Sequence, residues 1–206
     1  MNDSILIENY KNYDIKIELD DSDDNPRDWD NYSTMALFHN RYNLGDKIDF
    51  SNNDFNNWQE MKDYILKEIK PLWITPVYLY EHSGIKISMS DFNDRWDSSS
   101  IGFIYLTREN IEKMAGYKRI TKNRLNDLIE SCKHEFKNYD SYIRGEVYRY
   151  GVKAFDDYCG GFYSTDNAIF EAKFLIDYKI KQNQLKKNKK IKSYINNKIP
   201  LIYRFK

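Results

Sequence analysis

Alternating apolar and polar residues mark the first two elements of the chain. In residues 14–20, DIKIELD, every second position is apolar, which predicts a half-buried strand. Residues 33–39, STMALFH, predict a second strand. The intervening DDSDDNPRDWDN predicts an acidic loop, because turn-forming residues dominate it and Pro26 resists regular structure. A longer loop is expected at 40–57.

The apolar period changes to that of a helix at residues 57–69. Asn57 is placed to cap this helix, and Glu60 follows three residues later, in the pattern of a capping box. Pro71 then ends the helix. The apolar face is expected to consist of Trp58, Met61, Tyr64, Ile65 and Ile69.

The rest of the chain predicts a mixture of hairpins and helices. Strands are expected in WITPVYLYEH, IKISMS and IGFIYLT, the first two joined across a Ser83-Gly84 turn. Helices follow in RENIEKMA and TKNRLNDLIESCKHEFKNYDSYI, then strands in EVYRYGVKAF and YCGGFY. Thr165 opens a long helix, and the final IPLIYRFK is compatible with a strand or a loose tail. The apolar stripe expected to anchor this helix consists of Ile169, Phe170, Phe174, Leu175 and Tyr178.

This order of elements predicts an α+β fold in one domain, with a mainly antiparallel sheet, packed helices and a long basic C-terminal helix. A chain of 206 residues falls within the size of one domain. We expect a core domain at 1–177, continuous with a basic helix and tail at 178–206. Ten residues are expected to be buried around one sheet: Trp29, Phe38, Trp73, Tyr78, Tyr80, Phe103, Tyr105, Leu128, Phe136 and Phe162.

Composition narrows the class of protein. Aromatic residues make up 16% of the chain, which is more than disordered sequences carry. The chain has no apolar run of 18 residues, and MNDSILIENY lacks the features of an export signal, so we expect a soluble cytoplasmic protein that does not enter membranes. Cys132 and Cys159 have no metal-ligand spacing and are expected to be buried free thiols.

Formal charge is distributed unevenly along the chain. The total is zero, yet no Asp or Glu occurs after Asp177, while ten Lys or Arg do. Removing these ten from 32 basic residues leaves 22 against 32 acidic ones, so residues 1–177 carry a formal charge of −10. An acidic body followed by a basic segment indicates what kinds of partner a protein attracts, and it says little about the fold.

The acidic loop is the densest group of candidate functional residues. Asp24, Asp28 and Asp30 are close in sequence, with Arg27 between them, and His39 ends the next predicted strand. One interpretation is a solvated loop in which Arg27 bridges two aspartates, and this is the interpretation we favour. The alternative is a Mg²⁺ or Mn²⁺ site of a hydrolase or nuclease. That site would use Asp28, Asp30, His39 and His82.

A second group lies at the predicted hairpin. His82, Asp97 and Ser83 have the side chains of an acid–base pair and a nucleophile. No GxSxG elbow surrounds Ser83, so hydrogen bonds that pin the hairpin are the favoured interpretation. The sequence also lacks a GxGxxG or Walker loop, and we infer neither a cofactor nor a catalytic residue.

Lysines dominate the last predicted helix. Seven occur between residues 179 and 192 without one acidic residue, which exceeds what helix capping needs. Such a density of ammonium groups favours contact with phosphates. The candidate contact residues are Lys181, Lys186, Lys187, Lys189, Lys190 and Lys192.

Several segments together resemble a known group of proteins. DNPRDWDN (24–31), HNRYNLGD (39–46), PVYLYEHSGI (76–85), WDSSSIGFIYLT (96–107) and IRGEVYRYGV (143–152) carry the likeness. In these segments the chain resembles a family of small proteins encoded by phages, plasmids and other bacterial mobile elements. The lysine-rich stretch at 178–198 is an addition to that pattern. Mobile elements often carry inhibitors of host defence, so the resemblance implies an anti-CRISPR-like or other anti-defence protein.

The sequence therefore predicts a phage- or prophage-encoded inhibitor that binds a host nuclease or ribonucleoprotein without catalysis. Asp24, Asp28 and Asp30 would enter a basic protein channel, because clustered carboxylates imitate the phosphates of nucleic acid. The lysines would contact guide-RNA or other nucleic-acid phosphates. Two alternatives stay open: the metal-dependent hydrolase, and a nucleic-acid-binding accessory protein that uses the basic helix alone.

Overall fold

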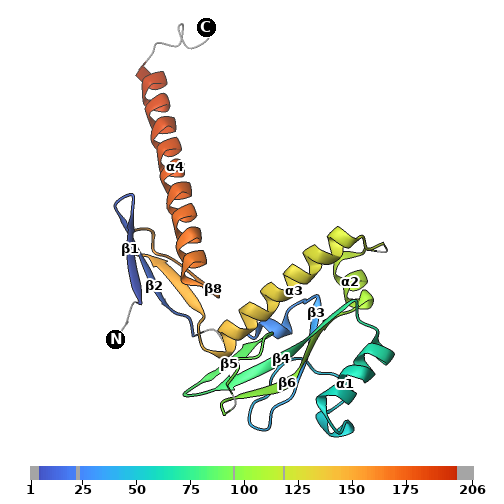
Figure 1. Cartoon of the computed structure of the whole chain (residues 1–206). Coiled ribbons are helices and arrows are strands. Elements are labelled where there is room, and N and C mark those ends of the chain that lie inside the picture. The colour runs from blue at the N-terminus through green and yellow to red at the C-terminus, as the bar shows by residue number, and fades with distance from the viewer. Residues whose placement is uncertain (1–4, 22–23, 95, 118, 199–206) are drawn as a thin grey trace. The chain divides into compact units, whose positions relative to one another are not determined.

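The structure is a computed structural model, and it describes residues 5–21, 24–94, 96–117 and 119–198 (Figure 1). The described strands form two four-stranded antiparallel sheets. The predicted α+β class and the long C-terminal helix are confirmed. The strands form two sheets rather than the one that was expected, since the chain divides into two compact units, residues 1–22 with 147–206 and residues 23–146.

The first unit joins both ends of the chain. Its sheet has the order β1-β2-β7-β8, and α4 covers one face (Figure 1). A two-residue turn joins β1 to β2, whereas β2 pairs with β7 across a large separation in sequence. The elements are β1 (Leu6–Tyr10), β2 (Tyr13–Leu19), β7 (Tyr148–Val152), β8 (Asp157–Phe162) and α4 (Thr165–Lys198), with a 3-10 helix at Lys153–Phe155.

Alternation along β2 builds the core of this unit. Ile15 and Ile17 are fully buried, while the residues between and beside them face outward. On α4 the buried residues are Ala168, Ala172 and Ile176, which recur every four residues. Two alanines at the contact let the helix backbone approach the sheet closely. We expected Ile169, Phe170, Phe174, Leu175 and Tyr178 to anchor the helix; of these, Phe170, Phe174 and Tyr178 are exposed.

The second unit is a three-layer arrangement around the sheet β3-β6-β4-β5. Its helix α3 lies on one face and α1 on the other (Figure 1). The strands are β3 (Ser33–Leu37), β4 (Trp73–Glu81), β5 (Ile85–Ser88) and β6 (Ser98–Leu106). The helices are α1 (Trp58–Tyr64), continued by a π-helical turn at Ile65–Ile69, then α2 (Arg108–Ala115) and α3 (Lys122–Ile143), with 3-10 helices at Pro26–Asp28 and Asn52–Asp54.

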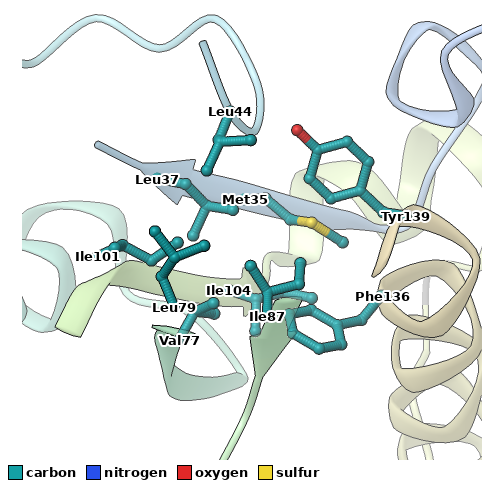
Figure 2. Close-up of a cluster of buried hydrophobic side chains, with 10 residues drawn as sticks. All are labelled: Met35, Leu37, Leu44, Val77, Leu79, Ile87, Ile101, Ile104, Phe136 and Tyr139. Atoms are coloured by element: carbon teal, nitrogen blue, oxygen red, sulfur yellow. The ribbon is translucent and has the colours of Figure 1, made fainter. Parts of the chain in front are cut away.

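Both faces of this sheet are packed, and six of the nine residues of its inner strand β6 are buried. On β3, Met35 and Leu37 face α3 while Ala36 faces α1. Figure 2 shows Phe136 and Tyr139 reaching from α3 into the first of these clusters. In β6 all residues from Ile101 to Leu106 are buried, which explains why IGFIYL has no strict alternation of apolar and polar residues.

Several expectations are corrected at the level of single residues. Trp29 is 51% exposed instead of buried, because it follows a short 3-10 helix at the surface. Cys132 is a buried free thiol as expected, whereas Cys159 is exposed on the edge strand β8. The two compact units follow other bounds than the ranges 1–177 and 178–206, while α4 runs unbroken through residue 177, which agrees with a basic helix continuous with the preceding residues.

Two observations complete the description of the elements. The proposed terminal strand or tail at 199–206 lies outside the described residues. Among the residues that are described, no helix combines the length and apolar character needed to cross a membrane.

Candidate nucleic-acid interface

The acidic loop is held at the surface by its own 3-10 helix. Asn25 caps this helix, its side chain accepting a hydrogen bond from the Arg27 backbone N–H at 3.0 Å. Pro26 is buried beneath it. Asp24, Asp28 and Asp30 are all exposed, and the carboxylates of Asp28 and Asp30 have no ion pair within the described part of the chain. The loop therefore presents carboxylates to solvent.

Arg27 does not bridge the aspartates of this loop, which corrects the interpretation favoured from the sequence. Its side chain is only 3% exposed and forms two hydrogen bonds to Asp46, Nε–Oδ1 at 2.8 Å and Nη2–Oδ2 at 2.7 Å. Nη2 also donates to the carbonyl of Ser33 at 2.8 Å, and Nη1 lies 3.8 Å from Glu135 Oε2. The guanidinium is thus enclosed between two carboxylates that the sequence places far from it.

These two carboxylates fix backbone segments in turn. Glu135 on α3 accepts hydrogen bonds from the N–H groups of Tyr32 and Ser33, at 2.7 and 3.0 Å. Asp46 accepts one from the N–H of Met35 at 2.8 Å. The PRDWDN and NLGD segments therefore tie the start of β3 to α3 and to the loop after β3. Their charges serve the fold of this unit.

Gly45 completes this network by allowing a close approach of the backbone. Its φ of +74° lies in the left-handed region, and a Cβ there would lie 2.4 Å from the carbonyl oxygen of Met35. Its N–H donates to the hydroxyl of Tyr139 at 2.8 Å. Only glycine meets both conditions at this position.

The four candidate metal ligands do not converge. His39 stacks on Tyr42, with ring centroids 5.0 Å apart, and its Nε2 lies 3.9 Å from Glu81. His82 is paired instead with Asp97 at 3.4 Å. Because each histidine has a different carboxylate partner, neither joins Asp28 and Asp30. Within the described ranges no group of three or more His, Cys, Asp or Glu side chains could hold a metal ion.

The hairpin residues His82, Ser83 and Asp97 and the thiol of Cys132 lie where they support the fold. The Glu81 N–H donates to the carbonyl of Asp97 at 2.9 Å, so the His82–Asp97 pair sits where β4 meets the segment before β6. Ser83 has a φ of +52° in the turn. Burial raises the pKa of the Cys132 thiol to about 12, which keeps it protonated and unreactive at neutral pH.

The lysine segment differs from all these groups in its surroundings. From residue 181 to 195 every side chain of α4 is exposed except Gln182, which is half-buried. Lys179 pairs with Asp157 at 2.9 Å. Lys181, Lys186, Lys187, Lys189, Lys190 and Lys192 have no ion pair with any described residue. This part of α4 extends past its sheet (Figure 1).

A groove lies between the lysine segment and the β1–β2 hairpin. Its volume is about 430 Å³, and it is lined by Tyr13, Ile180, Asn183, Gln184, Lys186, Lys187 and Lys190. The hairpin turn consists of Lys11 and Asn12, both with positive φ. Lys11 holds the turn against α4 by an ion pair with Asp177 at 2.6 Å. The Tyr13 ring packs on Phe155, with centroids 4.7 Å apart.

The chemistry of this groove suits an anionic chain. Three ammonium groups can contact phosphate oxygens, and the Asn183 and Gln184 amides can donate or accept hydrogen bonds. Sequence reasoning identified the lysines but missed Tyr13, Asn183 and Gln184. The spacing of Lys186, Lys187 and Lys190 could have shown that three cations share one side of the helix. No sequence signal places the hairpin beside them.

No family model, curated protein or solved structure matches the chain. The resemblance to mobile-element proteins therefore stays a prediction, and the site has to be interpreted from its own residues.

Proposed function

We propose that this chain acts by binding, and that the lysine segment of α4 with its groove contacts the phosphates of a nucleic acid. The observation that carries the proposal is the exposed, unpaired state of six lysines on a helix that continues past its sheet. Lysines this close together attract polyphosphates and release the counterions condensed on them.

The cost of keeping this segment helical supports the same proposal. Lys186 and Lys190 are four residues apart and repel each other across one turn. Beyond Ile180 no core cluster of the described residues supports the helix, so its stability there depends on local propensity, which repulsion between lysines lowers. An anionic partner removes the repulsion and supplies the missing contacts.

The cellular target that fits best is a nucleic-acid-containing defence complex of a bacterial host, located in its cytoplasm. The resemblance to phage and mobile-element proteins supports this more specific part. In such a complex the lysines would meet guide RNA or target strands. The exposed carboxylates of Asp24, Asp28 and Asp30 would meet a basic protein channel, as mimics of phosphate.

Binding to a labelled single-stranded RNA, followed by fluorescence anisotropy over a salt series, tests the lysine contact. If four lysines each meet one phosphate, the logarithm of the affinity falls with a slope of about −2.8 against the logarithm of salt, roughly a 50-fold loss between ~50 and ~200 mM. The variant is Lys186→Glu, Lys187→Glu, Lys189→Glu and Lys190→Glu combined. It should lose this binding and retain its circular dichroism spectrum.

A matched control separates a local contact from net charge. Lys67, Lys113, Lys122 and Lys137 are exposed lysines of the other unit, and their combined change to Glu alters the net charge equally. This variant should bind RNA with nearly the slope of the parent. Equal losses in both variants would mean that only net charge matters, and an unchanged affinity of the α4 variant would refute the proposal. Capture of a ribonucleoprotein from lysate that is lost on Asp24→Asn, Asp28→Asn and Asp30→Asn would support the defence target.

A further inference from the structure

The outer side of α4 carries large apolar residues that its own unit does not cover. Phe170 and Phe174 are each 67% exposed, and Tyr178 and Leu185 are 53% and 46% exposed. The first three recur every four residues and Leu185 follows two turns later, so all four share one side of the helix. We name these four residues the aromatic stripe.

The aromatic stripe lies on the side opposite to both the core and the groove. Ala168, Ala172 and Ile176 face the sheet, and each is about half a turn away from the stripe. A partner on the stripe would therefore leave the groove open. Exposed aromatic rows of this kind mark surfaces that bind another protein.

Charge along α4 identifies which partner fits. The first half of the helix contains Asp166, Glu171 and Asp177 against a single lysine, Lys173, which pairs with Glu8, whereas every charged residue from 179 to 198 is a lysine. Asp166 and Glu171 have no ion pair with any described residue. If a second copy of α4 runs antiparallel to the first, the acidic first half of each helix lies beside the basic second half of the other. A parallel copy would place lysines against lysines.

We propose that two copies of this chain associate through antiparallel packing of their aromatic stripes. In the register that overlaps residues 170–185, Phe170 of one copy lies beside Leu185 of the other, and Tyr178 lies near the two-fold axis. Asp166 then lies at the axial level of Lys189 of the second copy. Such a contact is isologous, so it closes at two chains. It does not depend on the proposed function, and its test uses no nucleic acid.

The mass of the full chain in solution, measured by light scattering from low to high micromolar concentration, tests the association. One chain has a mass of 24.9 kDa, and we expect the mass to rise toward twice this value as the concentration increases. Phe170→Glu combined with Phe174→Glu should remain at the mass of one chain. As a matched control, Tyr194→Glu changes an exposed aromatic residue on the other side of the same helix and should associate like the parent.

Disulfide trapping tests the antiparallel direction. In a Cys159→Ser background, Tyr178→Cys should form a linked pair under mild oxidation, because residue 178 faces its own copy near the axis. Ile195→Cys should not link, since in this register residue 195 lies past the N-terminal end of α4 in the second copy. A chain that stays single at high concentration overturns the proposal. So does an association unaffected by the double Glu variant, or linkage at Ile195→Cys without linkage at Tyr178→Cys.

Discussion

The guanidinium of Arg27 and the ammonium groups of α4 show two opposite uses of charge. Arg27 is almost fully buried and bound to Asp46 and Glu135, and it holds three segments of its unit together. The lysines from 181 to 192 are exposed, and no described carboxylate pairs with them. Charge density along a sequence therefore does not separate a structural charged group from a binding one. Burial and pairing do.

The largest expected effect comes from removing the buried cation. Arg27→Met should destabilise the second unit by about 3–5 kcal/mol, because Asp46 and Glu135, only 17% and 16% exposed, would keep their backbone hydrogen bonds but lose the cation that neutralises them. All four tryptophans of the chain lie between residues 29 and 96, so tryptophan fluorescence during urea unfolding reports this unit alone.

Arg41→Met is the control for that measurement. Arg41 pairs with Glu81, but its side chain is 65% exposed, so its loss should hardly move the urea midpoint. Equal midpoints for the Arg27 and Arg41 variants would show that the buried network contributes nothing beyond a surface ion pair, and the comparison would fail.

A smaller loss is expected at the backbone that shapes the network. Gly45→Ala should cost about 1–3 kcal/mol, because alanine is strained at this positive φ and its Cβ would meet the Met35 carbonyl. Gly84→Ala is the control, since nothing lies within 4 Å of a Cβ there. Thermal unfolding followed by tryptophan fluorescence distinguishes the two variants. A Gly45→Ala midpoint as high as that of Gly84→Ala would contradict the close approach.

Asp140 offers a milder case of a buried charge, and its effect depends on pH. It accepts a hydrogen bond from the Ile87 N–H at 2.9 Å and lies 3.3 Å from Arg144, yet desolvation by burial raises its pKa. The folded state therefore holds this proton to higher pH than the unfolded state. Stability from this group is present below the unfolded pKa of about 3.9 and is lost as pH rises through the folded value.

Asp140→Asn removes that dependence and tests the sign. The unfolding free energy of the variant should increase relative to that of the parent as pH rises from about 3 to about 6, within the range of carboxyl titration. Urea unfolding at a series of pH values measures the difference. A difference that moves in the other direction would mean that the ion pair with Arg144 outweighs desolvation.

The smallest effect on stability is expected at the lysines. The variant Lys186→Glu, Lys187→Glu, Lys189→Glu and Lys190→Glu should change amide exchange around Ala172 by no more than ~0.5 kcal/mol, as for surface substitutions generally. Amides beyond residue 181 should exchange quickly in the free protein and slow down when a partner binds. Loss of protection around Ala172 would instead give these lysines a structural role like that of Arg27.

Local patterns allowed much of the fold to be predicted. The alternation in DIKIELD identifies Ile15 and Ile17 as buried, as they are. Asn57 caps α1 by accepting from the Glu60 N–H at 2.9 Å, but the Glu60 carboxylate bonds to Asn56, so the predicted box is only half formed. Such features depend on residues a few positions apart, which is why the sequence shows them.

Features that depend on distant segments could not be predicted. The partners of Arg27 lie 19 and 108 positions away, and no pattern links them. The aromatic residues of α4 were assigned to the core because aromatics usually are buried, whereas the smaller Ala168 and Ala172 form the contact. The residues of strand β1 show no clear alternation, and the turn between β1 and β2 contains neither glycine nor proline, so the sequence did not indicate it. Tyr13 could therefore not be placed beside the lysines.

Pairing between the two ends of the chain also has a consequence for biosynthesis. The second partner strand of β2 begins at Tyr148, so about 130 residues must be translated after β2 before the sheet can be completed. At a ribosomal rate of ~5–20 residues per second this takes roughly 6–26 s, during which Ile17 and Leu19 have no sheet partner on that side. A premature stop before residue 147 would leave this edge permanently open. Truncated products of the gene should therefore aggregate more readily than the full chain.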